Sequence, residues 1–247
     1  MPCQTAAHRV FRALTPAAAL AACFLSCSDD EPQPQPSPRM PMPCTAGFPV
    51  HTGEATYYTF ADGSGNCCFP ATPTDLMVGA MNHTDYDGSY ACGSCVRVTG
   101  PDSVIDIRIV DQCPECPAGD IDLSPLAFSC IADIGRGRVP ISWRLISCPV
   151  TGPIVYHFQD SSNQWWTAVQ IRNHRYPVLS VEWRDAGGTF VSVPRTDWNY
   201  FVKSDGMGPG PYTFRVTDLF GHVVVDSGVA HTPGGDVSGA AQFEACP

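Results

Sequence analysis

Thirteen cysteines in a chain of 247 residues constrain its fold more than any other feature. Four of them form two C-x-x-C pairs, Cys92 with Cys95 and Cys113 with Cys116, at a separation that also occurs in zinc ribbons. Such pairs serve equally as redox motifs of the thioredoxin kind or as structural disulfides. The compartment in which the chain folds decides among these three interpretations.

The N-terminal region predicts that the chain is exported. Basic residues precede a short apolar stretch at 13–25, which is the pattern of a secretory signal. That stretch is too short to span a bilayer comfortably, because spanning takes about 20 apolar residues. We therefore expect a signal peptide at residues 1–27 and an extracellular or cell-surface location.

The end of the predicted signal resembles that of a bacterial lipoprotein. The sequence LAAC ends at Cys23, and a weaker version of the motif ends at Cys27. Residues 28–44 are rich in proline and polar side chains, so we expect a semi-rigid tether there. The pattern leaves open whether the chain is freely secreted or tethered to a membrane by an N-terminal lipid.

Export favours disulfides over zinc or redox chemistry, because cysteines pair in an oxidising compartment. Ten cysteines follow the predicted signal, an even number that allows five disulfides. The sequence therefore predicts neither a metal site nor a cofactor. The ten disulfide candidates are Cys44, Cys67, Cys68, Cys92, Cys95, Cys113, Cys116, Cys130, Cys148 and Cys246.

Cys246 is the one cysteine after residue 149. If it is oxidised, its partner must lie in an earlier part of the chain. The simplest pairing joins it to Cys44 and leaves the eight cysteines between them to pair among themselves, although Cys148 is a rival partner. A Cys44–Cys246 disulfide would clasp the two ends of the folded region and, in the chain-entropy model, stabilise it by several kcal/mol.

Hydrophobic periodicity predicts a mainly β protein. The stretches 104–111 and 139–148 alternate apolar and polar residues, as half-buried strands do. One short helix between them begins at Ser124 and stops at Gly135. From residue 153 onward the pattern indicates only short strands separated by turns, which favours a β-sandwich.

Two compact domains are expected, at 45–148 and 149–247. The sequence CPVTGP at 148–153 is the natural hinge between them. The net charge of −10 argues against nucleic acid as a partner, because phosphates are neutralised by lysine and arginine.

Six motifs carry a resemblance to a known family. They are GEATYYT at 53–59, ACGSCVRVTGP at 91–101, VDQCPECPAGDIDLSPLAF at 110–128, WRLISCPVTG at 143–152, WWTAVQIRNHRYPVLSVEW at 165–183 and TDWNYF at 196–201. Together they resemble the expansins, specifically the microbial expansin-like proteins. The resemblance implies a six-stranded double-psi β-barrel followed by an immunoglobulin-like carbohydrate-binding sandwich. It further implies a monomer that binds cellulose and matrix glycans of plant cell wall and loosens them without hydrolysis.

The resemblance places a polar groove on the first domain. Thr56, Asp111 and Asp122 match polar groove residues of the family, and Asp122 corresponds to the general acid of small inverting endoglucanases with the same barrel. The carboxylates around the second C-x-x-C pair would line this groove, and the disulfides would pin its loops. Glu115 and Asp120 are most simply interpreted as solvated loop charges.

Bacterial members of the family often carry a groove aromatic where this chain has Cys113. Part of the sugar platform is then either missing or supplied by Tyr57, Tyr58 or Tyr86. The cysteine-rich sequence is closer to the plant and fungal branch.

The resemblance places an aromatic platform on the second domain, made of Trp165, Trp166 and Trp198. Exposed aromatic rings bury the flat apolar face of a pyranose ring. Neighbouring residues of a regular strand point to opposite faces, so Trp165 and Trp166 can meet one glycan only at a bulge or a strand start. Trp183 and His174 are expected to be structural.

Two enzymatic alternatives remain open. Inverting hydrolysis needs two carboxyl groups about 6.5–9.5 Å apart, and the sequence offers Asp122 as the acid with Asp62 as the base. Peptidoglycan lytic transglycosylases use the same barrel with a single Asp. The aromatic second domain argues against them, because such enzymes usually carry peptidoglycan-binding modules instead.

Overall fold

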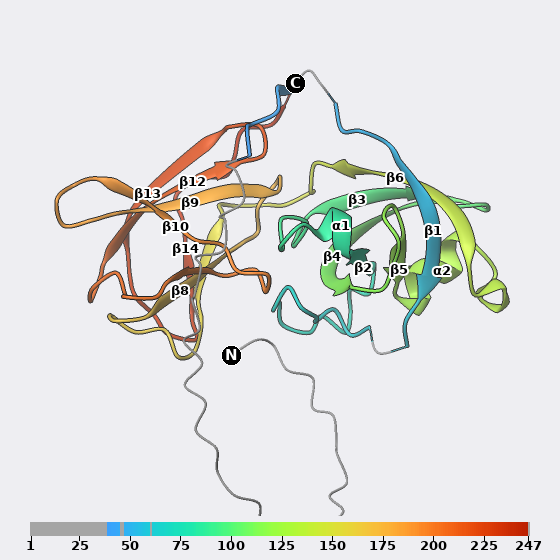
Figure 1. Cartoon of the computed structure of the whole chain (residues 1–247), viewed down its shortest axis with the longest axis horizontal. Helices are drawn as coiled ribbons and strands as arrows, with labels where there is room; N and C mark the ends of the chain where they lie inside the picture. The colour runs from blue at the N-terminus through green and yellow to red at the C-terminus, as the bar shows by residue number, and fades with distance from the viewer. Residues whose placement is uncertain (1–38, 45–46, 60, 247) are drawn as a thin grey trace, which may run out of the picture.

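The computed structural model describes residues 39–44, 47–59 and 61–246, which form two β-rich bodies side by side (Figure 1). The predicted signal and most of the tether, with Cys23 and Cys27, lie outside the described residues. Within the described part, no helix is both long and apolar enough to cross a membrane.

Six strands of the first body close into a barrel with the spatial order β1-β5-β2-β4-β3-β6, which confirms the predicted barrel. β1 pairs with β5, and β2 with β4, in parallel, whereas the other neighbours are antiparallel. Closure removes the exposed edges of an open sheet. The strands are β1 (His51–Tyr57), β2 (Val78–Asn82), β3 (Cys95–Thr99), β4 (Val104–Cys113), β5 (Ile121–Leu123) and β6 (Val139–Ile146).

Short helices connect the barrel strands. They are α1 (His83–Tyr86), α2 (Pro125–Ile131) and the 3-10 turn η2 (Ile134–Arg136). α2 begins where the sequence predicts, because the Ser124 side chain accepts a hydrogen bond from the Ala127 backbone and Pro125 fits the first turn. The predicted stop at Gly135 is wrong. The helix ends at Ile131, after which the backbone becomes extended, and Gly135 lies in η2.

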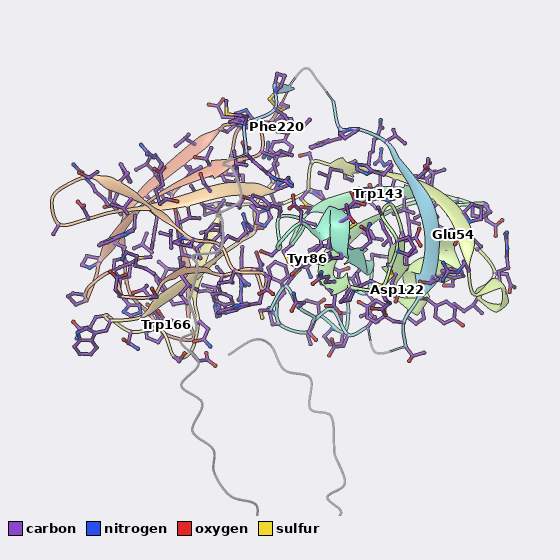
Figure 2. The ribbon with its side chains drawn as sticks, in the orientation of Figure 1. Glu54, Tyr86, Asp122, Trp143, Trp166 and Phe220 are labelled. Atoms are coloured by element: carbon purple, nitrogen blue, oxygen red, sulfur yellow. A yellow bond between two sulfur atoms is a disulfide. The ribbon has the colours of Figure 1, made fainter. Side chains whose placement is uncertain are left out.

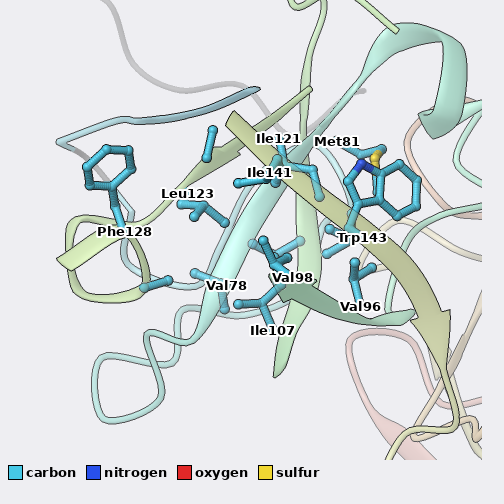
Figure 3. Close-up of a cluster of buried hydrophobic side chains, with 14 of the residues drawn as sticks. Val78, Met81, Val96, Val98, Ile107, Ile121, Leu123, Phe128, Ile141 and Trp143 are labelled. Atoms are coloured by element: carbon cyan, nitrogen blue, oxygen red, sulfur yellow. The ribbon is translucent and has the colours of Figure 1, made fainter. Parts of the chain in front are cut away.

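Alternate residues of the barrel strands point inward and form an apolar core (Figure 3). Ile107 and Ile109 of β4 are buried, whereas Asp106 is exposed, as the alternation predicts. Trp143 of β6 closes one end of this core, and its indole N–H donates a hydrogen bond to the Gly119 carbonyl at 2.7 Å. The core therefore fixes both the strands and the loop before β5.

The second body is a sandwich of two four-stranded sheets, with the orders β10-β9-β12-β13 and β11-β8-β7-β14. All neighbouring strands in it are antiparallel. Tyr156, Phe158 and Phe214 form part of the core between the sheets. The strands are β7 (Val155–Phe158), β8 (Thr167–Arg172), β9 (Val178–Arg184), β10 (Phe190–Val193), β11 (Phe201–Lys203), β12 (Tyr212–Asp218), β13 (Val223–Val229) and β14 (Asp236–Ser238).

His174 and Trp183 occupy structural positions in the sandwich. The His174 ring is buried and its Nδ1 lies 2.8 Å from the Tyr176 carbonyl oxygen. Burial lowers the pKa of His174 to about 4, so the ring is neutral at physiological pH. Trp183 is half-buried and packs against the core of the sandwich.

Four disulfides cross-link the described residues. They are Cys44–Cys246, Cys67–Cys92, Cys95–Cys148 and Cys113–Cys116. The Cys44–Cys246 disulfide, with a sequence separation of 202, is the clasp that the position of Cys246 predicts. The rival partner, Cys148, pairs with Cys95 instead. The sulfurs of the two C-x-x-C pairs are spread over three separate disulfides, so they do not form a zinc ribbon.

The expected fifth disulfide is not formed among the described residues. It would have to join Cys68 to Cys130, the two candidates outside the four disulfides. Cys130 is exposed on α2, on the side of the barrel that faces away from the sandwich (Figure 1). The loop of Cys68 lies at the domain contact, because Gln170 of β8 donates a hydrogen bond to the carbonyl of neighbouring Cys67.

Candidate functional site

Strand register brings four residues into one row across the barrel. Thr56 of β1 is paired with Asp122 of β5, Asp122 with Ala80 of β2, and Ala80 with Asp111 of β4. Neighbouring strands lie about 4.8 Å apart, so the backbones of the two aspartates, with Ala80 between them in the row, lie roughly 10 Å apart. We call these four residues the groove row. Thr56 and Asp122 are 66 positions apart in sequence, and the parallel pairing of β1 with β5 brings them together.

Asp122 is held by its neighbour in the row. The Thr56 hydroxyl donates a hydrogen bond of 2.5 Å to Asp122 Oδ1. Burial raises the pKa of Asp122, the Thr56 hydrogen bond opposes that rise, and the charge of Glu115 adds to it. The carboxyl group therefore keeps its proton to a higher pH than an exposed aspartate does.

Asp111 is held by the glycine-rich loop that follows β1. Its Oδ1 accepts hydrogen bonds from the backbone N–H of Asn66 at 2.7 Å and of Gln112 at 2.8 Å. Burial raises the pKa of Asp111, and these two hydrogen bonds oppose the rise. A methyl group at Gly65 would lie 2.4 Å from Asp111 Cγ, so the loop approaches this carboxyl group as closely as it does only because residue 65 is glycine.

The same loop connects the groove row to the sandwich. The Asn66 side chain donates to the Tyr86 hydroxyl and to the Asp197 carbonyl oxygen, both at 2.8 Å. Tyr86 also donates to the Asp197 carbonyl, at 2.7 Å. Trp198 is the next residue. Asn66 thus links its own loop, which holds Asp111, to the loop that carries Trp198. No feature of the sequence pattern indicated this role.

A second set of contacts supports this domain junction. Ser89 donates to the Thr196 carbonyl at 2.7 Å, and Asn199 donates to the Cys67 carbonyl at 3.1 Å. The Arg195 guanidinium is sandwiched between the rings of Tyr90 and Phe201, at 4.3 and 4.5 Å. Figure 2 shows Tyr86 between Asp122 and the sandwich.

The three tryptophans of the predicted platform lie in loops. Trp165 is 71% exposed, whereas Trp166 and Trp198 are half-buried. Asn163 Oδ1 accepts hydrogen bonds from the backbone N–H of Trp165 and of Trp166, at 2.9 and 3.1 Å. This turn sits directly before β8, which is the strand-start position that the adjacent pair requires. Trp198 packs on Tyr200, with ring centroids 4.8 Å apart.

The tyrosine candidates have different environments. Tyr57 packs its ring on Phe128 beside the barrel core, with centroids 5.1 Å apart. Burial raises the pKa of Tyr58, and the nearby charges of Asp111 and Asp122 raise it further. Tyr86 is buried, with its hydroxyl in the domain junction. Of the three, Tyr58 is the one beside the groove row.

The loop carboxylates also differ from their expected roles. Glu115 is exposed, as expected, but Asp120 is buried and accepts a hydrogen bond from the Glu54 backbone at 2.7 Å. Arg138 Nη1 donates to Glu54 at 2.9 Å and lies 3.7 Å from Asp120. The interpretation of Asp120 as a solvated charge is therefore wrong, because it anchors β1. The Arg138 charge also lowers the pKa of Asp122, against the effect of burial.

Comparison with known proteins identifies the family. A family model described as "Lytic transglycolase" matches residues 50–143, which contain most of the barrel. Expansin-YoaJ of Bacillus subtilis (strain 168) is 35% identical over 182 residues, covering 72% of this chain and 78% of that protein. The chain belongs to the expansin family. Expansin-like protein 2 of Dictyostelium discoideum is 31% identical to this expansin over 184 residues, covering 70% of it and 45% of that protein.

Solved structures agree with the fold of this expansin. The apo expansin of Clavibacter michiganensis matches with a TM-score of 0.75 and 33% identity, covering 80% of this chain and 99% of that one. A point mutant of the same protein, in complex with cellohexaose, also matches with a TM-score of 0.75, at 32% identity. The closed barrel followed by a β-sandwich is thus the expansin fold.

The groove row of this expansin has the groups needed to exchange hydrogen bonds with a glycan. A protonated carboxyl group at Asp122 donates and accepts, as does the Thr56 hydroxyl. Ala80 is buried, whereas Thr56, Asp111 and Asp122 are half-buried, so the row presents its polar side chains rather than an apolar surface.

Proposed function

We propose that this expansin is exported, binds cellulose and matrix glycans of the plant cell wall, and loosens them without hydrolysis. In this proposal the sandwich provides adhesion through Trp165, Trp166 and Trp198. The groove row competes for the hydrogen bonds that hold neighbouring glycan chains together. The observation that carries the proposal is the hydrogen-bonded path from Asp111 through Asn66 to the loop that carries Trp198.

The carboxylates of the row support binding rather than cleavage. Inverting hydrolysis uses an acid and a base whose environments push their pKa values apart. In the row, burial raises the pKa of both Asp111 and Asp122. In the groove row, β1 contributes Thr56, and Tyr58 follows directly after β1. Neither side chain is a carboxylate, so neither can act as the base that activates water. Because burial shifts the pKa values of Asp111 and Asp122 in the same direction, the row does not show the separation of pKa values expected of an acid and a base, and the proposal assigns both carboxyl groups to hydrogen bonding with glycan oxygens.

The test of this proposal separates adhesion, loosening and cleavage. We expect Asp122→Asn to keep its affinity for crystalline cellulose but to lose most wall-extension or paper-weakening activity, with no soluble sugar released by either protein. Asp102→Asn is the matched control, because it makes the same substitution at an exposed carboxylate of the barrel outside the groove row. Asp122-dependent release of reducing sugar would contradict the proposal.

One observation favours the hydrolytic alternative enough to test it. Hydrogen bonds from Ser64 lower the pKa of Asp62, whereas burial raises that of Asp122, and both charges act on Tyr58. That is the separation of pKa values expected of a base and an acid. An Asp62/Asp122 endoglucanase would release sugar from soluble cello-oligosaccharides, and both Asp62→Asn and Asp122→Asn would abolish the release.

Two further parts of the proposal, the preferred polysaccharide and the attachment of the N-terminus to a membrane, can be tested on the same preparation of the exported protein. Because the matching family model is described as "Lytic transglycolase", peptidoglycan sacculi belong beside cellulose and xylan in the pull-down, and we expect cellulose to retain the most protein. Mass spectrometry of the N-terminal peptide distinguishes a free N-terminus after the signal from a lipid on Cys23 or Cys27.

A further inference from the structure

A histidine lies against the disulfide that joins the two ends of the folded region. His222 Nε2 is 3.5 Å from Cys44 Sγ. The ligand atoms of Cys44, Cys246 and His222 all lie within 4.8 Å of one another. The His222 ring lies 6.1 Å from the ring of Phe220, measured between centroids. Phe220 is at the opposite end of the sandwich from Trp166 (Figure 2), so the cluster lies away from the predicted platform.

A buried carboxylate orients the His222 ring. Asp218 Oδ2 lies 2.8 Å from His222 Nδ1, and Asp218 is 0% exposed. The other oxygen, Oδ1, accepts hydrogen bonds from the backbone N–H of Phe220 and of His222, both at 2.9 Å. Since a carboxylate accepts hydrogen bonds, the ring proton belongs on Nδ1, and the lone pair of Nε2 faces the sulfur. Metal-binding histidines have this arrangement.

Backbone contacts hold both cysteine segments in place independently of the sulfur–sulfur bond. The Met42 N–H donates to the Leu219 carbonyl at 2.9 Å, two residues before Cys44. The Cys246 N–H donates to the Tyr176 hydroxyl at 2.9 Å. If the disulfide is reduced, these contacts keep the two thiols beside His222.

We propose that the reduced clasp is a zinc site, with the thiolates of Cys44 and Cys246 and Nε2 of His222 as ligands and water in the fourth position. A dithiol reductant supplies two electrons and two protons to the disulfide, which becomes two thiols while the reductant becomes a disulfide. Zn²⁺ then displaces one proton from each thiol. Two sulfurs and one imidazole form a ligand set that zinc accepts with an open fourth position. The ends of the chain are clasped by sulfur under oxidising conditions and by metal under reducing ones.

Burial favours selective reduction of this disulfide. Cys44 and Cys246 are both half-buried, whereas each of the other disulfides contains at least one buried cysteine.

To test the proposal, the full chain is treated with a limiting amount of dithiol, the reductant is removed in the absence of oxygen, and the protein is titrated with Co²⁺ as a spectroscopic probe. We expect one equivalent to bind with a thiolate-to-cobalt charge-transfer band, and Zn²⁺ to displace it.

Variants distinguish this site from adventitious binding by other reduced cysteines. Cys44→Ser with Cys246→Ser should remove the cobalt band, and His222→Gln should weaken zinc binding at least about tenfold. Asp218→Asn should weaken it by about 10–100-fold, provided that the oxidised variant melts as the parent does. His231→Gln, elsewhere in the sandwich, should leave it unchanged. An unaltered cobalt spectrum in the double serine variant, or unaltered affinity in His222→Gln, would overturn the proposal.

Discussion

The barrel and the sandwich place their candidate binding groups in two different ways. In the barrel, Thr56, Asp111 and Asp122 project from strands, and the pairing of those strands sets their spacing. In the sandwich, Trp165 and Trp166 lie in a turn that the Asn163 side chain organises locally. The arrangement of the groove residues therefore depends on long-range strand register, and their hydrogen bonding depends on protonation. Binding by the platform depends on exposed apolar area, and its arrangement depends on short-range hydrogen bonds.

This difference implies that adhesion and loosening can be separated by mutation, although the two bodies are in contact. Asn66 bridges them, with its backbone at Asp111 and its side chain at Asp197. Changes in the sandwich loops should act on affinity. Changes in the groove or at the junction should act on what the bound protein does to the wall.

The largest expected effect is the loss of the platform. Replacing Trp165, Trp166 and Trp198 by alanine should reduce cellulose affinity roughly a hundredfold or more, because each stacked ring contributes on the order of 1 kcal/mol beyond its buried area. Binding isotherms on crystalline cellulose measure the effect, and circular dichroism checks the fold. Trp183→Phe, within β9, is the control that keeps affinity. Unchanged affinity in the triple variant would place adhesion in the barrel instead.

A smaller effect is expected from uncoupling the two bodies. Asn66→Ala keeps the backbone hydrogen bond to Asp111 but removes both hydrogen bonds of the side chain, which should lower the free energy of unfolding by about 1–3 kcal/mol. We expect unchanged cellulose affinity and a severalfold loss of wall extension. Ser89→Ala removes another hydrogen bond across the same junction, to Thr196, away from the Asp111 loop. If both variants lose loosening equally, the effect of Asn66 is general destabilisation and not alignment of groove with platform.

The smallest expected effect is the pH dependence of the groove. Because burial raises the pKa of Asp122 above its ordinary value of 3.8, the folded chain binds more protons than the unfolded chain between those two values. The free energy of unfolding therefore falls as the pH rises through that window, and Asp122→Asn removes that contribution. Wall extension should likewise be greatest in acid and decline as Asp122 ionises, while adhesion by the tryptophans stays constant. Urea unfolding and extension assays from pH about 4 to about 8 measure both.

Several features of this expansin follow from its sequence alone. Alternation in 104–111 and 139–148 reports which residues of a strand face inward, and both stretches are barrel strands. The isolated position of Cys246 required a partner earlier in the chain, and the simplest of the candidates, Cys44, is the one with which it pairs. Ser124 and Pro125 fixed the start of α2, because a helix start depends on local backbone hydrogen bonds. The strand and helix predictions use neighbouring residues in the sequence, and the disulfide prediction uses the number and positions of the cysteines. Neither requires knowing which strands lie side by side.

The tertiary structure decided what periodicity does not encode, which is the strand or loop that lies next to each residue. Register alone assembles the groove row from β1, β5, β2 and β4. Packing assigned Tyr58 to the carboxylates and Tyr57 to Phe128, buried Asp120 beneath β1, and kept Cys68 apart from Cys130. Asn66 has no distinguishing sequence signal, because its partners Tyr86 and Asp197 lie 20 and 131 residues away. A polar side chain acquires such a role only when closure of the barrel and docking of the sandwich bring its partners within hydrogen-bonding distance.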